Sequence, residues 1–446
     1  MLFSFSQVYV RVGIEIGLVP IPINISGTGS MFPTFPKGEG VTYQEQSNEV
    51  VEIPVFRAYP GGFSLLGHEY LKHKLSHGDI VSFRNSTTDA IILGEGGDLA
   101  ITQGFVKRVI GLPGDSIELR DGFVFRNNSR VVEPYIASAR STFGGAFLPD
   151  CKPLLVPNGM VFVMGDNRKA SNDSRHDLGL ISINDIDFVL PLPSQVVYQD
   201  RWRDPSEDTT TAAQPLLNKT ELIQAINEIR LANNKPALKN DTRLDTSAKL
   251  RAQAILRSGD LSFEATQSGL TMKQAMTKAN YSNITWGEIP VLGYYSAEEL
   301  VESMQHVQSM RTFLLNEDFD DIGVASMIGE LNACPTQVVV THVAGYIPPN
   351  YSQSQRDSWI DSVTSLERLR ENWLQARGYG GFYEDNKQDI EKVISMIEER
   401  LAIATRIRNK IVNEQWLNDQ DNAEINKLET LAEQHQALAS DLNSRN

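Results

Sequence analysis

Alternating apolar and polar positions dominate the first 200 residues and predict strands. Residues 105–110 read Phe-Val-Lys-Arg-Val-Ile. Because side chains alternate along a strand, Phe105, Lys107 and Val109 are predicted on one face and Arg108 on the other. Residues 8–19 also read as an apolar strand. The Gly-Asp and Pro-Gly-Asp sequences at 78–79 and 113–115 predict tight turns that feed strands.

The periodicity changes after Pro193. Residues 201–215 are rich in Pro, Ser, Asp, Thr and Ala, which is typical of a linker. Apolar residues then recur every three or four positions, first at Leu222, Ile226 and Ile229, which predicts amphipathic helices. From about residue 352 the chain is polar and helical. The predicted domains are therefore 1–200, 216–348 and 352–446, with 201–215 as the linker.

The last region carries two apolar stripes at near-heptad spacing with charges between them. The stripes are Ile390, Ile397, Leu401, Ala404 and Ile411, and Leu428, Leu431, His435, Leu438 and Leu442. The glycine-rich residues 378–381 separate the helices. Two interpretations stay open: an intramolecular helical hairpin, and a coiled coil that binds a helical partner or a second copy of the chain.

Composition excludes some classes of protein. A net charge of −15 over 446 residues argues against non-specific binding to nucleic acid. Cys151 and Cys334 lie in different predicted domains, so no disulfide framework is expected. The seven histidines form no convincing metal site, and no metal or organic cofactor is expected.

Four short segments of the first half carry the candidate chemistry. They read Gly-Ser-Met-Phe-Pro-Thr at 29–34, His-Gly-Asp-Ile-Val at 77–81, Lys-Arg-Val-Ile-Gly-Leu-Pro-Gly-Asp at 107–115, and Gly-Asp-Asn-Arg-Lys-Ala-Ser-Asn-Asp-Ser-Arg at 165–175. In this order they resemble the signature boxes of type I signal peptidases, which are serine proteases with a lysine base. The resemblance implies an all-β domain of curved antiparallel sheets, with Ser30 as nucleophile and Lys107 as general base.

The chemistry of these two residues fits that assignment. A serine hydroxyl needs a base to take its proton. Lysine, with an ordinary pKa of about 10.4, can serve when burial among apolar side chains lowers its pKa. The glycine-rich residues 26–30 allow a substrate backbone to come close. The resemblance further implies that the Ser30 N–H and the Thr28 hydroxyl stabilise the oxyanion.

The resemblance also implies supporting roles around the dyad. Ser171 is expected to form a hydrogen bond with the lysine amine. An ion network behind the site is expected from Asp166, Arg168, Asp173, Arg175 and Arg108. Shallow apolar pockets formed by Met31, Phe105 and Val106 are expected to select small residues at the −3 and −1 positions of exported preproteins, the expected substrates.

Residues 216–348 resemble a CAP domain, an α/β sandwich of the cysteine-rich secretory, antigen 5 and pathogenesis-related family. The similar segments are the helix at 222–230, Trp-Gly-Glu-Ile at 286–289, and the stretch at 311–324. Two histidines common in that family align with Phe263 and Met310, which leaves Glu288. A Phe and a Met are not zinc ligands, so no metal is expected in this cleft.

The N-terminal 29 residues contain no apolar stretch of about 18 residues, the length that spans a bilayer. The expectation is a membrane-associated protein with its catalytic domain on the extracytoplasmic face and an anchor lost or truncated at the N-terminus. The membrane surface is then a partner, through Phe32, Phe35, Phe143 and Phe147 if these are exposed.

Two other functions stay open: a LexA-like self-cleaving Ser–Lys protease, and a catalytically silent scaffold that acts through the CAP and helical regions. The residues from 216 on are expected to be dispensable for the chemistry.

Overall fold

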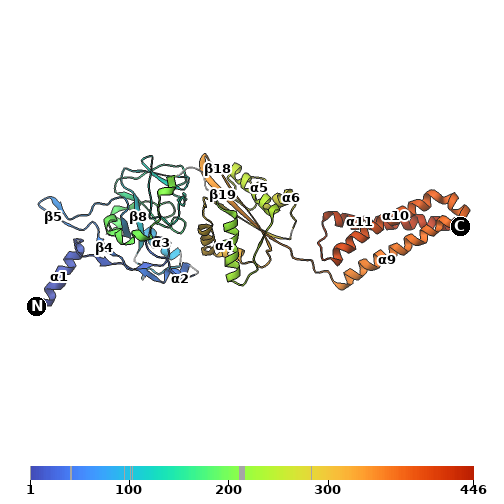
Figure 1. Ribbon diagram of the computed structural model, residues 1–446, viewed down its shortest axis with the longest axis horizontal. Helices are drawn as coiled ribbons and strands as arrows, with labels where there is room; N and C mark the ends of the chain where they lie inside the picture. Colours follow the sequence, from blue (N-terminus) through green and yellow to red (C-terminus); the bar gives the residue numbers. More distant parts are fainter. Residues whose placement is uncertain are drawn as a thin grey trace. The chain divides into compact units, whose positions relative to one another are not determined.

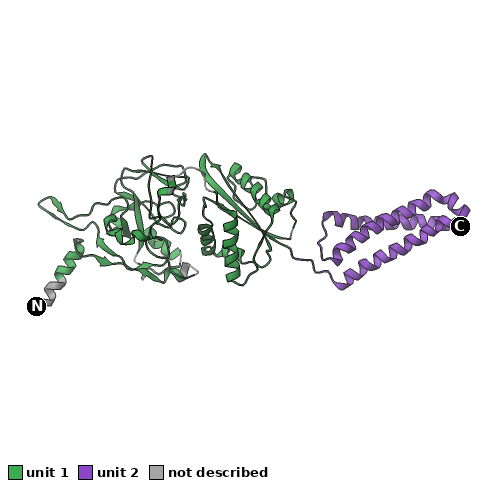
Figure 2. Cartoon of the chain, in the orientation of Figure 1, with its two compact units in different colours: residues 1–345 green, residues 346–446 purple. Residues whose placement is uncertain are grey.

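The computed structural model describes residues 2–40, 43–94, 96–100, 102, 104–209, 216–282 and 284–445 (Figure 1). The chain divides into two compact units, residues 1–345 and 346–446 (Figure 2). The first unit contains both the mostly-β region and the α/β region that the sequence predicts. The second unit is helical, so the predicted multidomain architecture is confirmed.

Antiparallel sheets build the N-terminal half of unit 1. Within the described residues, the main sheet has the order β1-β4-β15-β7-β8-β13-β14 and a second sheet has the order β11-β10-β9-β12. The bounds in the main sheet are β1 Ile21–Pro22, β4 Val55–Ala58, β15 Ile186–Leu190, β7 Ile80–Phe83, β8 Phe105–Gly111, β13 Met160–Met164 and β14 Ile181–Ser182. Those in the second sheet are β11 Ser129–Arg130, β10 Phe123–Arg126, β9 Ser116–Arg120 and β12 Leu154–Leu155.

Shorter elements surround these sheets. The ribbons are β2 Ile25–Ser26 with β3 Val50–Glu52, and β5 Phe63–Leu65 with β6 His68–Tyr70. The helices are α1 Leu2–Glu15, α2 Tyr43–Ser47, α3 Ser86–Gly94 and the 3₁₀ helices η1 Ile183–Asp185, η2 Leu192–Arg201 and η3 Ser206–Thr209.

Strand β8 runs through the centre of this domain, and its two faces pack in different cores. Val109 packs with β7 and β15 residues, whereas Ile110 points to the second sheet and packs against Ile117. The alternation predicted for residues 105–110 is therefore confirmed. It sends Lys107 and Arg108 to opposite faces of the sheet, which gives neighbouring residues two separate environments.

Three expectations for this domain are corrected. Residues 8–19 are not a strand, since α1 spans Leu2–Glu15; a helix satisfies its own backbone hydrogen bonds without a neighbouring strand. Phe35 is buried and is not a membrane contact. Trp202, in the predicted linker, packs its ring against Tyr135 at 5.9 Å, so the packed domain continues past residue 201. Residues 210–215 lie outside the described residues. No helix of the described chain is both long and apolar enough to cross a bilayer.

The second half of unit 1 is an α/β/α sandwich. The sheet has the order β16-β18-β19-β17. Its strands are β16 Lys239–Asn240, β18 Asp321–Leu331, β19 Cys334–Gly345 and β17 Thr285–Leu292, and its helices are α4 Lys219–Ala232, α5 Thr242–Ser258, α6 Met272–Lys278, α7 Ala297–His306 and α8 Gln308–Leu314. Alternation along β19 fills two cores: Val339 and Val343 face α4 and α7, and Val338 and Val340 face α5.

A disulfide joins the two halves of unit 1. Cys151 of the β domain bonds Cys334 at the start of β19, with a Cα–Cα distance of 5.7 Å and a sequence separation of 183. The expectation that these cysteines form no disulfide framework is therefore wrong. Nothing in their spacing signals the pair, because it depends on how one domain docks on the other.

Unit 2 contains α9 Gln353–Gln375, the 3₁₀ helix η4 Ala376–Gly378, α10 Gly380–Val412 and α11 Asp419–Ser444. The glycine-rich residues 378–381 lie at the α9–α10 junction, as predicted. Ile390, Ile397, Ile411 and Leu442 of the two apolar stripes are buried in one core within the unit. The structure thus uses both stripes intramolecularly, as the hairpin interpretation requires.

Candidate active site

The first and third polar segments meet at one point. Ser30 lies in the loop after β2, and Lys107 lies on β8. The Lys107 Nζ donates a hydrogen bond to Ser30 Oγ at 3.1 Å, across 77 residues of sequence. Lys107 is 4% exposed, and its Nζ lies 5.2 Å from the centroid of the Phe105 ring. The arrangement pairs a hydroxyl with a buried amine within hydrogen-bond distance.

A cleft of about 510 Å³ opens beside this pair. Its walls include the predicted residues Thr28, Met31, Phe105 and Val106, together with Ile23, Asn24, Ile25, Ser82, Ala170 and Asn172. β8 pairs with β7 along residues 105–108, whereas its pairing with β13 starts at Arg108. The edge of β8 that faces the cleft is therefore positioned to receive an extended peptide.

The fourth segment, residues 165–175, closes the base of the site. The Asn167 N–H donates to the Ser30 carbonyl at 3.1 Å. A Cβ at Gly165 would lie 2.4 Å from that carbonyl oxygen and 2.3 Å from Ser171 Oγ, so glycine is required for this approach. Ser171 is buried, but within the described chain its hydroxyl has no hydrogen-bond partner. The hydrogen bond expected between Ser171 and Lys107 is not formed in this structure.

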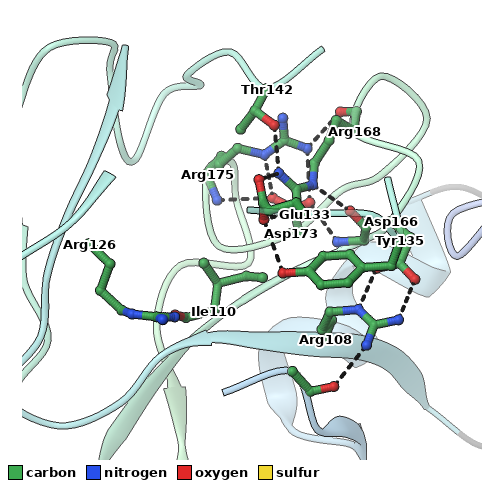
Figure 3. A network of polar contacts seen from close by, with 12 residues as sticks. Arg108, Ile110, Arg126, Glu133, Tyr135, Thr142, Asp166, Arg168, Asp173 and Arg175 are labelled. Atoms are coloured by element: carbon green, nitrogen blue, oxygen red, sulfur yellow. Dashed lines mark hydrogen bonds and ion pairs between the residues drawn. The ribbon is translucent and has the colours of Figure 1, made fainter. Parts of the chain in front are cut away.

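Arg108 and Asp166 form a fully buried ion pair behind the site (Figure 3). Arg108 Nε and Nη2 of its guanidinium group each donate to Asp166 at 2.7 Å. Asp166 also accepts from the Thr34 hydroxyl at 2.5 Å. The guanidinium lies 4.0 Å from the Tyr135 ring centroid, which adds a cation–π contact. This pair ties β8, the Ser30 loop and residues 165–175 together.

Two further buried pairs hold the 165–175 segment. Arg168 pairs with Glu133, and Nη1 of its guanidinium group donates to the Thr142 hydroxyl at 2.5 Å (Figure 3). Arg175 pairs with Asp173 at 2.8 Å. Burial alone would raise the pKa of Asp173, but Arg175 and two backbone N–H groups hold that pKa below its usual value. The five charged residues expected here thus all make buried ion pairs.

Sequence reasoning missed several members of this network. Glu133 and Gln195 contact Arg168 and Arg108 from segments outside the four motifs. Trp202 donates to the Thr34 hydroxyl at 3.0 Å from a segment assigned to the linker. An acidic residue or a Trp in such surroundings gives no sign of its distant partner. Thr34 lies within the first motif, so it was the position from which the contact with Trp202 could have been sought.

The predicted CAP cleft has a different centre from the one expected. The Glu288 side chain is 1% exposed and accepts hydrogen bonds from Arg251 at 2.7 and 2.8 Å and from His342 Nε2 at 2.8 Å. Burial would raise the pKa of Glu288, but His342 and Arg251 lower it. Phe263 is 53% exposed, and Met310 packs against the α4–α7 core. The Glu288 carboxylate is thus engaged by protein partners.

Comparison with known proteins gives matches for both halves of unit 1. Residues 7–189 match the family model described as signal peptidase, peptidase S26, and residues 223–340 match the cysteine-rich secretory protein family, CAP. Signal peptidase I of Bacillus licheniformis is 44% identical over 94 residues, 19% of this chain and 50% of that protein. Signal peptidase I S of Bacillus subtilis is 39% identical over 108 residues, 22% of this chain and 59% of that protein. The chain spans about half the length of the curated relatives it matches. A solved signal peptidase I of Enterococcus faecalis is 30% identical, with 26% of this chain and 97% of that chain covered and a TM-score of 0.20.

Proposed function

From the membership of residues 7–189 in the signal peptidase family, peptidase S26, and of residues 223–340 in the CAP family, we propose that this chain is a serine endopeptidase that removes signal peptides with a Ser30–Lys107 dyad. The observation that carries the proposal is the 3.1 Å hydrogen bond between Lys107 Nζ and Ser30 Oγ at the wall of the cleft. The chemistry needs a hydroxyl and a buried amine in contact, and the cleft admits an extended peptide.

In the proposed mechanism, Ser30 Oγ attacks the scissile carbonyl carbon while its proton passes to the neutral Lys107 amine. The oxyanion accepts hydrogen bonds from the Ser30 N–H and the Thr28 hydroxyl, donors of a kind worth about 3–4 kcal/mol in other hydrolases. Lys107 then gives the proton to the leaving amine, and an acyl-enzyme remains. Water attacks this ester, Lys107 takes the water proton, and the proton returns to Ser30 Oγ as the acid product leaves.

The surrounding residues would act by holding this geometry. The buried pairs of Arg108, Asp166, Arg168, Asp173 and Arg175 fix the strand and the segment that flank the dyad. Ser171 lies against Gly165, with its hydroxyl buried. Catalytic hydrogen bonds are often made only when substrate is bound, and we assign to Ser171 a hydrogen bond to the Lys107 amine in that state.

The proposed substrates are exported preproteins, cut after small side chains. Met31, Phe105 and Val106 line the cleft next to the dyad and would form shallow apolar pockets for residues −1 and −3. The Cys151–Cys334 disulfide supports an extracytoplasmic position, because disulfides persist in oxidising compartments.

Cleavage of a synthetic signal-peptide sequence by the full chain tests the proposal, with the products identified by mass spectrometry. Ser30→Ala and Lys107→Ala should each abolish cleavage, and the double variant should be no worse, because the two residues act as one unit. Lys107→Arg should fail as well, since Arg does not lose its proton in proteins. Substitution of Ser129 by Ala, at an exposed serine of the same domain, is the matched control. Retention of most activity in Lys107→Ala would refute the dyad.

A further inference from the structure

The CAP domain contacts the peptidase domain next to the catalytic segment. The Tyr295 ring stacks on Phe143, with centroids 6.3 Å apart, and its hydroxyl donates to Asp121 at 3.2 Å. Lys37, which lies beside Gly29 of the nucleophile loop, pairs with Glu302 of α7 at 2.9 Å. Together with the disulfide, these contacts dock the turn before α7 onto the edge of the active site.

Lys169 is the residue of the catalytic segment that enters the CAP domain. Its Nζ donates to the Gly293 carbonyl at 2.9 Å. The ammonium lies 4.1 Å from the Tyr294 ring centroid and 4.5 Å from that of Phe143. One ring comes from each domain, so the cation joins them, and both contacts are within the range of a cation–π interaction. Lys169 is not part of the proposed proton-transfer chemistry.

Glu299 of α7 faces the same region from the CAP side. The residue is 8% exposed, and its carboxylate accepts a hydrogen bond from the Ser141 hydroxyl of the peptidase domain. Burial raises the pKa of Glu299, and the positive charge of Lys169 opposes that rise. Burial lowers the pKa of Lys169 to about 8, while the carboxylates of Glu299 and Asp150 raise it and Arg175 lowers it. An acid of the CAP domain and a base of the peptidase domain thus influence one another electrostatically across the domain boundary.

From this boundary, neighbouring residues and their hydrogen bonds lead to the backbone of Ser30. Ser141 adjoins Thr142 and Phe143, whose hydroxyl and carbonyl accept from Arg168 at 2.5 Å and Arg175 at 3.0 Å. These two arginines hold the 165–175 segment, whose Asn167 N–H binds the Ser30 carbonyl. The CAP domain therefore supports, from outside, the segment that sets the position of Ser30.

We propose that Lys169 is a positioning residue for the peptidase site, held by Gly293 and Tyr294 of the CAP domain, and that the docked CAP domain is required for full peptidase activity. This inference rests on the proposed function for its catalytic readout. It replaces the expectation that the residues from 216 on are dispensable for the chemistry.

The test uses the full chain with Lys169→Met, which keeps the apolar stem and removes the ammonium. We expect kcat for a signal-peptide substrate to fall at least tenfold with KM within about twofold, because a displaced nucleophile slows the chemical step more than binding. Lys169→Arg keeps the cation between the rings and should restore at least half of the activity. Lys74→Met, at an exposed lysine of the peptidase domain, is the control and should leave kcat unchanged. Unchanged kcat in Lys169→Met would overturn the proposal.

Hydrogen exchange separates this inference from the proposed function. In Lys169→Met, backbone amides of residues 165–175 should exchange at least tenfold faster, while those of strands β4 and β15 keep their rates. This result is expected whether or not any peptide is cleaved. If the wild-type chain cleaves nothing, the proposed function fails, and the exchange rates still decide whether the CAP domain holds the segment. Equal exchange of residues 165–175 in both proteins would refute the positioning role.

Discussion

Substitution of Asp166 by Asn removes the charge that balances Arg108 while it keeps the size of the side chain. Neither side chain of this pair has exposed surface. Removal of one partner from a buried ion pair typically costs about 3–5 kcal/mol, because the remaining charge is buried without compensation. A domain has about 5–15 kcal/mol of stability in total, so the loss is a large part of it.

The remaining partners of Arg108 set where in this range the cost falls. Its guanidinium keeps hydrogen bonds to the Gly78 carbonyl at 2.8 Å and the Gln195 amide oxygen at 2.6 Å. The Tyr135 ring stays beneath it at 4.0 Å. Arg does not lose its proton in a protein, so the charge of Arg108 stays buried in the variant. The two neutral dipoles and the π-face still stabilise that charge in part. We therefore expect a loss of unfolding free energy near the lower end of the range, about 3 kcal/mol.

Hydrogen exchange of the β8 and β13 amides measures this cost within the peptidase domain, where a global melting curve would mix the units. The expected loss corresponds to a decrease in protection of about two orders of magnitude. Glu52→Gln is the control, because its pair with Arg201 is partly exposed and is worth less than about 1 kcal/mol. If Asp166→Asn costs no more than this control, the argument from a buried, uncompensated charge is wrong.

Three further predictions follow from single positions. Gly165→Ala should reduce the cleavage rate at least a hundredfold, because the added Cβ would lie 2.4 Å from the Ser30 carbonyl oxygen. Gly94→Ala is the control: no atom lies within 4 Å of its added Cβ, so the cleavage rate should be unchanged. The pKa of Lys169 is lowered from 10.5 to about 8, so the unfolded chain binds more protons between these values. Hydrogen exchange of residues 165–175, corrected for the intrinsic rate at each pH, should show protection that rises with pH across this window in the wild type but not in Lys169→Met. Calorimetry should detect no stoichiometric zinc binding that depends on Glu288, since its carboxylate is already bound by protein donors; micromolar affinity abolished by Glu288→Gln would contradict this.

The sequence predicts best what short-range periodicity controls. Alternation along residues 105–110 predicts the opposite directions of Lys107 and Arg108, because the period of a strand is a local property. The same rule fails at residues 8–19. A short apolar run is compatible with a strand or a helix, and the choice depends on whether a partner strand is available. None pairs with this segment within the described residues, and it forms α1.

Contacts across long sequence distances are harder to predict. Glu133 and Gln195 join Arg168 and Arg108 over 35 and 87 residues, and their types are common in surface loops. The domain boundary was missed for a related reason. Composition near residue 201 indicates a linker, but Trp202 packs on a surface that the folded peptidase domain forms from Thr34 and Tyr135, and the cysteine pair forms only when both domains are folded.

The disulfide between the two halves of unit 1 also sets the order in which parts of the folded protein can be completed during synthesis. Cys151 and Cys334 are 183 residues apart, so at about 5–20 residues per second the second thiol is synthesised roughly 10–40 s after the first. The nucleophile and base are both made before that interval begins. The CAP contacts that we propose to position them come only after β19 is complete. A nascent chain would therefore carry its dyad for many seconds before acquiring full activity, which delays proteolysis until synthesis has passed the second domain.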